Sequence, residues 1–240
     1  MTRRSGAALP LSVAPEVLPH EPDLTPEHKE AVLAALRWAW AELVRQDESV
    51  ATAGDEESVS AKLQELLNAY SGHLRRAYWL QDFATVTRGE SQRSVDGRIG
   101  KKPDLTFRPI AHRDVRNSSH WGWFVECKVI QGVNSVTRYR DQGVQRFSSG
   151  EYAARMPSGA MVAYVRDGSR PWPVLSKALH NRARTIGKRE GQSDDSCESD
   201  HDRSQLPTPC VTVTLTHLWL QIPQPNQDLE CSAGPWIDRH

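Results

Sequence analysis

The sequence lacks several features that would place it quickly in a class of protein. Its 240 residues contain only four cysteines, which lie far apart (Cys127, Cys197, Cys210 and Cys231), so a scaffold held by disulfides is excluded. No apolar run approaches the roughly 18 residues that a membrane helix needs. The apolar stretch after Arg4 is broken by two prolines, and we expect no signal peptide there. These absences predict a cytoplasmic protein that does not enter a membrane.

Net charge is also absent, because 30 Lys and Arg oppose 30 Asp and Glu. This balance excludes proteins that bind nucleic acid through bulk positive charge, such as histones. The charge is nevertheless uneven along the chain. Residues 128–190 hold twelve Lys and Arg against four Asp and Glu, whereas residues 191–240 hold two against eight. A basic segment of this kind can follow a nucleic-acid backbone even in a neutral chain.

Two helices are predicted in the first third of the chain. Thr25 and Pro26 form an N-cap followed by a proline in the first turn, and apolar residues then recur at helical spacing to residue 46. Acidic residues open a second helix at residue 55. We expect residues 1–23 to be a flexible segment and residues 24–50 to be a helical appendage that docks a partner protein or a second copy.

Strands dominate the rest of the chain. Aromatic and β-branched residues predict strands at 78–89, 103–110, 121–130, 159–167 and 210–222. Helices are predicted at 134–155 and 174–185, and composition indicates a loop at 191–204. This order predicts an α/β fold, with a mixed central sheet flanked by helices in one domain over residues 51–222. Residues 223–240 are expected to form an irregular tail.

Charged residues interrupt two of the predicted strands. Asp104 starts one strand, and Glu126 and Lys128 lie inside the most hydrophobic one. Because side chains alternate along a strand, Glu126 and Lys128 share one face while Cys127 lies on the other. A buried charge costs several kcal/mol unless it is paired or binds a metal. Carboxylates favour a hard cation such as Mg²⁺ or Mn²⁺, and a lysine beside such a site suits phosphodiester hydrolysis.

The motif Pro103-Asp104, followed after 22 residues by Glu126-Cys127-Lys128, resembles the PD-(D/E)xK nuclease superfamily. The predicted order of elements resembles it too. This resemblance implies a restriction-endonuclease-like fold with an αβββαβ core. It further implies that Asp104 and Glu126 bind Mg²⁺ or Mn²⁺, that the backbone carbonyl of Cys127 is a further ligand, and that Lys128 positions the attacking water.

The resemblance covers residues 55–167 and implies a metal-dependent nuclease that hydrolyses phosphodiester bonds, with DNA favoured over RNA. The run from Arg146 to Gly168 is similar to uncharacterised bacterial and phage-defence nucleases. A protein partner in a defence complex, or a homodimer, is therefore a further expectation. Two alternatives stay open: an inactive module of the same fold that binds nucleic acid or a partner, and a metal-dependent phosphatase.

A glutamate from the first core helix often reaches the metal in this superfamily, and three residues are candidates. Glu56 is the first choice because it precedes Val59 and Leu63 at helical spacing and shares their inward face. Glu57 is the second choice and Glu65 the third. The motif itself does not decide between them.

Candidates for contacts with nucleic acid lie on both sides of the motif: Lys101, Lys102, Gln142, Gln145 and Arg146. The two lysines directly precede Asp104. The other three lie in the helix after the third strand, from which the superfamily often takes a further polar residue. A zinc site is not expected, because the Cys and His residues in the last third of the chain match no common spacing (Cys197, His201, Cys210 and His217).

Overall fold

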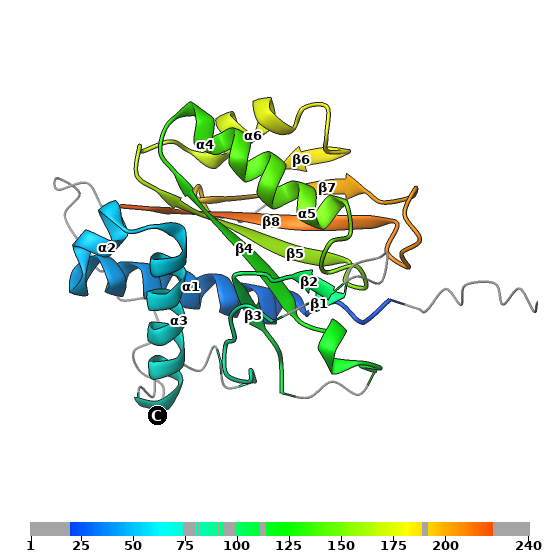
Figure 1. Cartoon of the computed structure of the whole chain (residues 1–240), viewed down its shortest axis with the longest axis horizontal. Coiled ribbons are helices and arrows are strands. Elements are labelled where there is room, and N and C mark those ends of the chain that lie inside the picture. The colour runs from blue at the N-terminus through cyan, green and yellow to red at the C-terminus, as the bar shows by residue number, and fades with distance from the viewer. Residues whose placement is uncertain are drawn as a thin grey trace, which may run out of the picture.

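The computed structural model describes residues 20–73, 80, 82–90, 92–93, 99–110, 114–188 and 192–222, without the side chains of residues 70–73, 92–93 and 99–101. These residues form an α/β fold in which helices flank a six-stranded mixed sheet (Figure 1). The fold class predicted from the sequence is confirmed at this level. Most of the predicted flexible segment and the whole predicted tail lie outside the described residues. Among the described helices, none combines the length and apolar character required to cross a membrane.

The sheet has the strand order β3-β4-β5-β8-β7-β6. Its strands are β3 (Leu105–Phe107), β4 (Trp123–Ile130), β5 (Ser158–Val165), β6 (Thr185–Gly187), β7 (Ser196–Asp202) and β8 (Thr212–Gln221). The central strands β4, β5 and β8 are parallel, and each outer strand is antiparallel to its inner neighbour. Central parallel strands are covered on both faces, which explains the apolar runs of β4 and β5. A separate hairpin joins β1 (Gln92–Arg93) to β2 (Ile99–Lys101).

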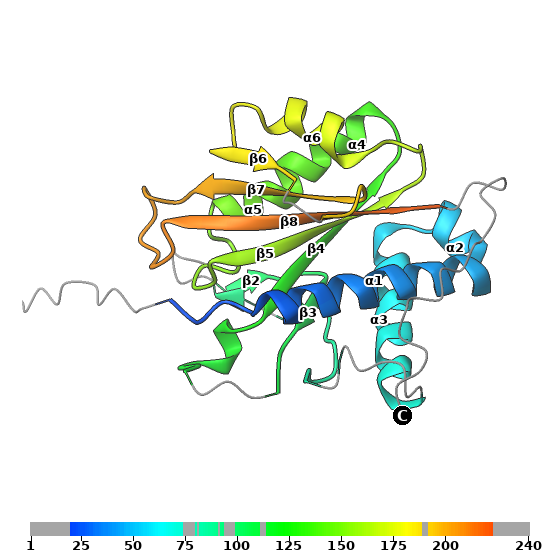
Figure 2. The ribbon, with the colours of Figure 1, turned by 180° about the vertical axis from the view of Figure 1, so that it is seen from behind.

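Helices cover both faces of the sheet, as Figures 1 and 2 show. One group consists of α1 (Pro26–Gln46), α2 (Glu48–Ala53) and α3 (Glu56–His73). The other consists of α4 (Val133–Arg138), the π-helical segment η3 (Tyr139–Val144), α5 (Gln145–Ser148) and α6 (Pro171–Leu179). A short 3-10 turn, η2 (Ser118–His120), precedes β4. The N-terminal helices therefore cover one face of the sheet, and the helices that follow β4 cover the other.

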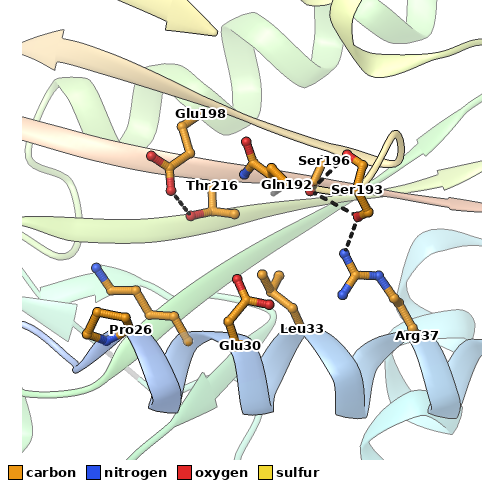
Figure 3. A pocket seen from close by; sticks show the side chains of 10 residues that line it. Pro26, Glu30, Leu33, Arg37, Gln192, Ser193, Ser196, Glu198 and Thr216 are labelled. Atoms are coloured by element: carbon orange, nitrogen blue, oxygen red, sulfur yellow. Dashed lines mark hydrogen bonds between the residues drawn. The ribbon is translucent and has the colours of Figure 1, made fainter. Parts of the chain in front are cut away.

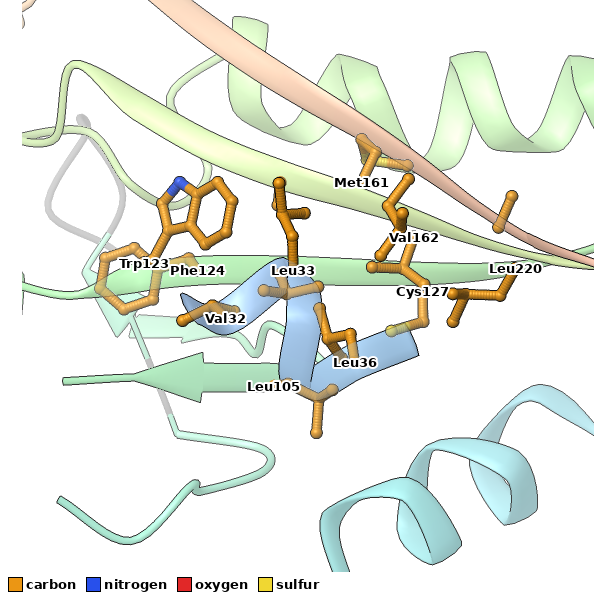
Figure 4. Close-up of a cluster of buried hydrophobic side chains, with 14 of the residues drawn as sticks. Val32, Leu33, Leu36, Leu105, Trp123, Phe124, Cys127, Met161, Val162 and Leu220 are labelled. Atoms are coloured by element: carbon orange, nitrogen blue, oxygen red, sulfur yellow. The ribbon is translucent and has the colours of Figure 1, made fainter. Parts of the chain in front are cut away.

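Helix α1 belongs to the hydrophobic core of the domain. Thr25 caps it by accepting a hydrogen bond from the backbone N–H of His28 (3.2 Å). The ring of Trp40 stacks on Tyr164 of β5, and its indole N–H donates to the carbonyl of Gln221 (2.6 Å). Figure 4 shows Leu33 of the same helix pointing toward the strands. The segment expected to be an appendage therefore covers one face of the sheet instead of standing apart from it.

The strand predicted at 78–89 is absent from the described residues of that segment. These residues make two isolated bridges, Phe83 with Pro109 and Thr87 with Thr106. The side-chain amides of Gln64 and Asn68 both donate to the carbonyl of Val86, whose N–H donates back to Asn68 (2.9 Å each). Helix α3 thus satisfies the backbone groups of Val86, while Thr87 exchanges backbone hydrogen bonds with Thr106 on the other edge of the segment.

The loop predicted at 191–204 is also wrong, because β7 lies there. Its acidic composition indicates a loop, but its side chains alternate. Cys197, Ser199 and His201 are buried on the inner face, while acidic residues occupy the other. Pairing with β8 and burial of one face thus outweigh a low strand propensity.

Two predicted helices have different bounds in the structure. The helix predicted at 134–155 ends at Ser148, and Gly150, with a φ of 70°, turns the chain away shortly afterwards. The helix predicted at 174–185 begins earlier, at Pro171, and ends at Leu179. Proline suits the first helical turn because its missing N–H has no partner there.

A chain of polar side chains is buried beneath η3. The hydroxyl of Tyr139 lies 2.8 Å from Nδ1 of His217, and the hydroxyl of Ser199 lies 2.7 Å from both Nε2 of His217 and Nε2 of His201. Burial lowers the pKa of His217 to about 3 and that of His201 to about 4. Both rings are therefore neutral in the folded protein at neutral pH, and they hold β7, β8 and η3 together.

We expect these histidines to make folding sensitive to mild acid. Their folded-state pKa values lie below the ordinary value of 6.5, so their contribution to stability is complete above that pH and falls as the pH drops toward 4. One histidine contributes about 2 kcal/mol to this loss between pH 7.5 and pH 5. Urea unfolding at pH 7.5 and pH 5 should show that the free energy of unfolding falls less in His201→Gln than in the natural protein. Because both proteins have the same carboxyl groups, the titration of these groups does not account for a difference between them. Equal losses of unfolding free energy would contradict the expectation.

Candidate active site

The candidate site lies where β4 has an open edge. β3 pairs only with Trp123, Phe124 and Val125, so β4 continues beyond its neighbour. Asp104 immediately precedes β3, and its Oδ2 accepts a hydrogen bond from the N–H of Cys127 (2.7 Å). The N–H and C=O of one strand residue point to the same side, so the carbonyl of Cys127 faces this edge as well. The open edge therefore brings a carboxylate and a backbone carbonyl together.

The ammonium of Lys128 lies at the centre of the site. It donates to Oε1 of Glu56 (2.6 Å), to Oε1 of Glu126 (2.8 Å) and to the carbonyl of Cys127 (2.7 Å), which uses all three of its protons. Burial lowers the pKa of Lys128, but the charges of Glu126, Glu56 and Asp104 outweigh burial and raise it overall. Lys128 is thus a permanent cation held among oxygen atoms.

Glu126 is completely buried and is bound through both of its oxygens. Its Oε1 accepts from Lys128 (2.8 Å) and from Nη1 of Arg146 (2.5 Å), and its Oε2 accepts from the hydroxyl of Tyr152. A buried carboxylate needs this complete set of donors, because an unpaired charge in the interior is strongly destabilising.

The segment η3 approaches the sheet closely above Glu126. A Cβ atom at Gly143 would collide with Cε of Met161 and would lie 3.7 Å from Cγ of Glu126. Only glycine therefore fits at this point without displacing Met161. Because the helix comes this close, Arg146, one turn further on, reaches the carboxylate. A π-helical segment is itself a feature often found at functional sites.

Asp104 has a carboxyl group whose pKa is strongly changed by its surroundings. Burial, followed by the nearby charge of Glu126, raises its pKa to about 7, although Lys128 and the N–H of Cys127 act in the opposite direction. A carboxyl with a pKa near neutrality, next to a cation, is typical of a functional site.

The structure brings together the residues of the motif and decides between the three glutamates. Glu56, at the start of α3, contacts Lys128, as its inward spacing predicts. Glu57 is 88% exposed, and Glu65 pairs with Lys62 (2.8 Å) on the outer face of the helix. The thiol of Cys127 is buried on the opposite face of β4, among the apolar core (Figure 4).

Not all the candidates for nucleic-acid contacts join this cluster. Arg146 does, but its guanidinium is directed at Glu126. Lys102, Gln142 and Gln145 are exposed, and the side chain of Lys101 lies outside the described residues. Gln142 and Gln145 lie on the same helical segment as Arg146.

Tyr152 is the site residue that the sequence did not reveal. It lies outside the helix and shares no spacing with the motif. The chain turns at Gly150, where φ is 70°, before it reaches Glu126, and the path of this turn depends on hydrogen bonds from the distant Arg203. The one available hint is a tyrosine close behind Arg146 in the polar run after the third strand.

The oxygen atoms around Lys128 have the chemistry that a hard divalent cation requires. Glu56, Glu126 and the carbonyl of Cys127 converge on one point, and Asp104 lies beside them. Within the described part of the chain, however, no three His, Cys, Asp or Glu side chains form a ready-made metal site. The ammonium of Lys128 occupies the point that these oxygens share. The donor set fits Mg²⁺ or Mn²⁺ on condition that Lys128 moves aside.

A separate polar pocket lies between α1 and the strands β7 and β8 (Figure 3), with a volume of about 330 Å³. The strand register places its lining residue Thr216 and the site residue Glu126 on opposite faces of the sheet. Its cations Lys29 and Arg37 each pair with an aspartate, at 2.6 and 2.7 Å. The pocket is therefore distinct from the candidate site, and both of its cations are already neutralised.

Comparison with known proteins gives no match to a protein-family model, to a curated protein or to a solved structure.

The cluster around Glu126 should behave as one unit in unfolding experiments. Lys128→Met removes a cation from a buried carboxylate and should lower the free energy of unfolding by about 3 kcal/mol. The double variant Glu126→Gln/Lys128→Met removes both charges and should be less destabilised than the two single variants added together. Urea denaturation of all four proteins measures this coupling. Strictly additive losses would mean that the two side chains do not interact as the structure has them.

Proposed function

We propose that this protein is a metal-dependent nuclease that hydrolyses phosphodiester bonds, with DNA as its substrate. One observation carries the proposal. Asp104, Glu126, the carbonyl of Cys127 and Lys128 lie around one point at the open edge of β4, joined by Glu56 from a distant helix. Carboxylates, a carbonyl and a lysine in one place suit phosphodiester hydrolysis better than they suit a plain core.

In the proposed mechanism, Asp104, Glu126 and the carbonyl of Cys127 hold Mg²⁺ or Mn²⁺, with Glu56 beside them. When bound, the cation supplies a Lewis acid for a phosphate oxygen and activates a water. Lys128 orients the attacking water and stabilises charge that develops on the phosphate. The described bonds of Arg146 involve only Nη1, which leaves further N–H groups of its partly exposed guanidinium for the substrate.

The order of elements supports a restriction-endonuclease-like core for this proposal. After α3 and the separate β1–β2 pair come β3, β4 antiparallel to it, the helical segment α4–η3–α5 and β5 parallel to β4. The residues at 83–87, which bridge to the β3 region, stand where the first strand of an αβββαβ core is expected.

The charge distribution supports a nucleic-acid substrate. The surplus of Lys and Arg in residues 128–190 includes Arg138 and Arg146, which lie on the helical segment above the site. Gln142 and Gln145 are exposed on the same segment, and Lys102 is exposed just before Asp104. Such a row of donors can follow phosphates without requiring a basic protein overall.

An inactive module of the same fold is the second candidate, and one observation favours it. In the structure the ammonium of Lys128 already satisfies Glu56, Glu126 and the carbonyl of Cys127. A protein that used the fold only to bind nucleic acid or a partner would need no further cation.

Cleavage assays with the purified full chain test the proposal. We expect plasmid DNA to be cut in the presence of Mg²⁺ or Mn²⁺ but not with EDTA. Asp104→Asn and Lys128→Met should each reduce the rate by about 100-fold or more, because the first removes a charged ligand of the cation and the second removes the group that orients the attacking water. Lys62→Met, on the outer face of α3, is the matched control and should cut like the natural protein.

The substrates distinguish the alternatives. Tight binding of duplex DNA without cleavage under any metal would support the inactive module. Turnover of mononucleotides but not of polymers would indicate a phosphatase. Metal-dependent cutting that survives both Asp104→Asn and Lys128→Met would exclude this site as the source of the activity.

A further inference from the structure

The two oxygens of Glu126 are held by different kinds of group. Oε1 accepts from two cations, Lys128 and Arg146, whereas Oε2 accepts from the neutral hydroxyl of Tyr152. A metal ion that binds Glu126 must compete with the two cations, because like charges repel at this distance. It does not compete with the hydroxyl, which leaves the negative charge of the carboxylate intact.

Tyr152 is held more firmly than Arg146. Its side chain is fully buried, and its ring packs edge-on against Phe147 with ring centres 5.0 Å apart. Burial, followed by the charge of Glu126, raises the pKa of its hydroxyl well above the usual value, so it remains a proton donor at all physiological pH values. Arg146, by contrast, has a side chain that is 29% exposed and can move toward solvent.

A buried arginine holds the turn that presents Tyr152. The guanidinium of Arg203 donates to the carbonyls of Phe147, Ala153 (3.0 Å) and Met156 (3.4 Å), on both sides of Tyr152 in the chain. Arg203 is only 1% exposed, and burial lowers its pKa to about 10. Placing a cation among carbonyls in the interior is costly, and here it fixes the path of this turn.

We infer that Tyr152 is a positioning residue that fixes the orientation of Glu126 for a divalent cation, and that Arg203 holds Tyr152 in place. Because the hydroxyl holds Oε2, it would keep the plane of the carboxylate fixed if Lys128 and Arg146 gave up Oε1 to a divalent cation. Hydrogen bonds that orient a metal-binding carboxylate in this way contribute strongly to affinity. The inference rests on the proposed metal-dependent function and adds to it a residue outside the motif.

Titration of the full chain with Mn²⁺, followed by calorimetry, tests this role without relying on activity. Tyr152→Phe keeps the ring and removes only the hydroxyl. It should weaken Mn²⁺ binding by about 10-fold or more. Tyr139→Phe is the matched control, because it removes a buried hydroxyl of the same kind, bonded to His217 (2.8 Å), away from the carboxylates. It should bind Mn²⁺ like the natural protein while losing a similar amount of thermal stability.

Cleavage at increasing Mn²⁺ provides a second measurement. Tyr152→Phe should need more Mn²⁺ for half-maximal cleavage and should regain most of the natural rate at saturation, which a generally damaged fold would not do. One result would overturn the role of Tyr152 but leave the proposed function standing. In that case the natural protein binds Mn²⁺, Glu126→Gln does not, and Tyr152→Phe binds it as tightly as the natural protein. If the natural protein itself does not bind Mn²⁺, the proposed function fails together with it.

Discussion

The buried carboxylate of Glu126 is the constraint on which the surrounding structure depends. A charge in the interior must be matched by donors on every side. Lys128 from the same strand, Arg146 from the helical segment above it and Tyr152 from the following turn provide these donors. Their positions impose requirements on other residues in turn. Glycine at position 143 leaves room for Met161 where the helix approaches Glu126, and the turn keeps its path because Arg203 binds its carbonyls.

The unequal lengths of β3 and β4 explain why chemistry is concentrated at one place. Along its paired half, β4 exchanges backbone hydrogen bonds with β3, and its polar groups are satisfied there. Beyond Val125 the N–H of Cys127 is bound by the side chain of Asp104 and its carbonyl by Lys128. An unpaired strand edge thus supplies backbone atoms to the cluster, while the opposite face of the same strand packs against the core (Figure 4).

Features with strong local causes could be predicted from the sequence. The helix over residues 26–46 follows from its cap, its proline and its apolar spacing, and its bounds are confirmed. The strands around Glu126 and Met161 follow from their apolar, β-branched runs. The inward position of Glu56 follows from helical spacing and is confirmed by its contact with Lys128. The strand at Ser196–Asp202 could not be predicted in this way, because its acidic residues acquire a strand conformation only through pairing with β8 and burial of their neighbours.

Three features could be recognised from the sequence: the α/β class, the shared face of Glu126 and Lys128, and the motif that includes Asp104. Each of these depends on spacing along a single helix or strand, which local stereochemistry fixes. Three others depend on tertiary contacts: α1 belongs to the core, Lys128 occupies the point shared by the oxygen donors, and Tyr152 and Arg203 contact the site and the turn beside it. Those contacts join segments that are far apart in the chain. They form only when packing of the sheet and its helices brings buried charges within reach of partners.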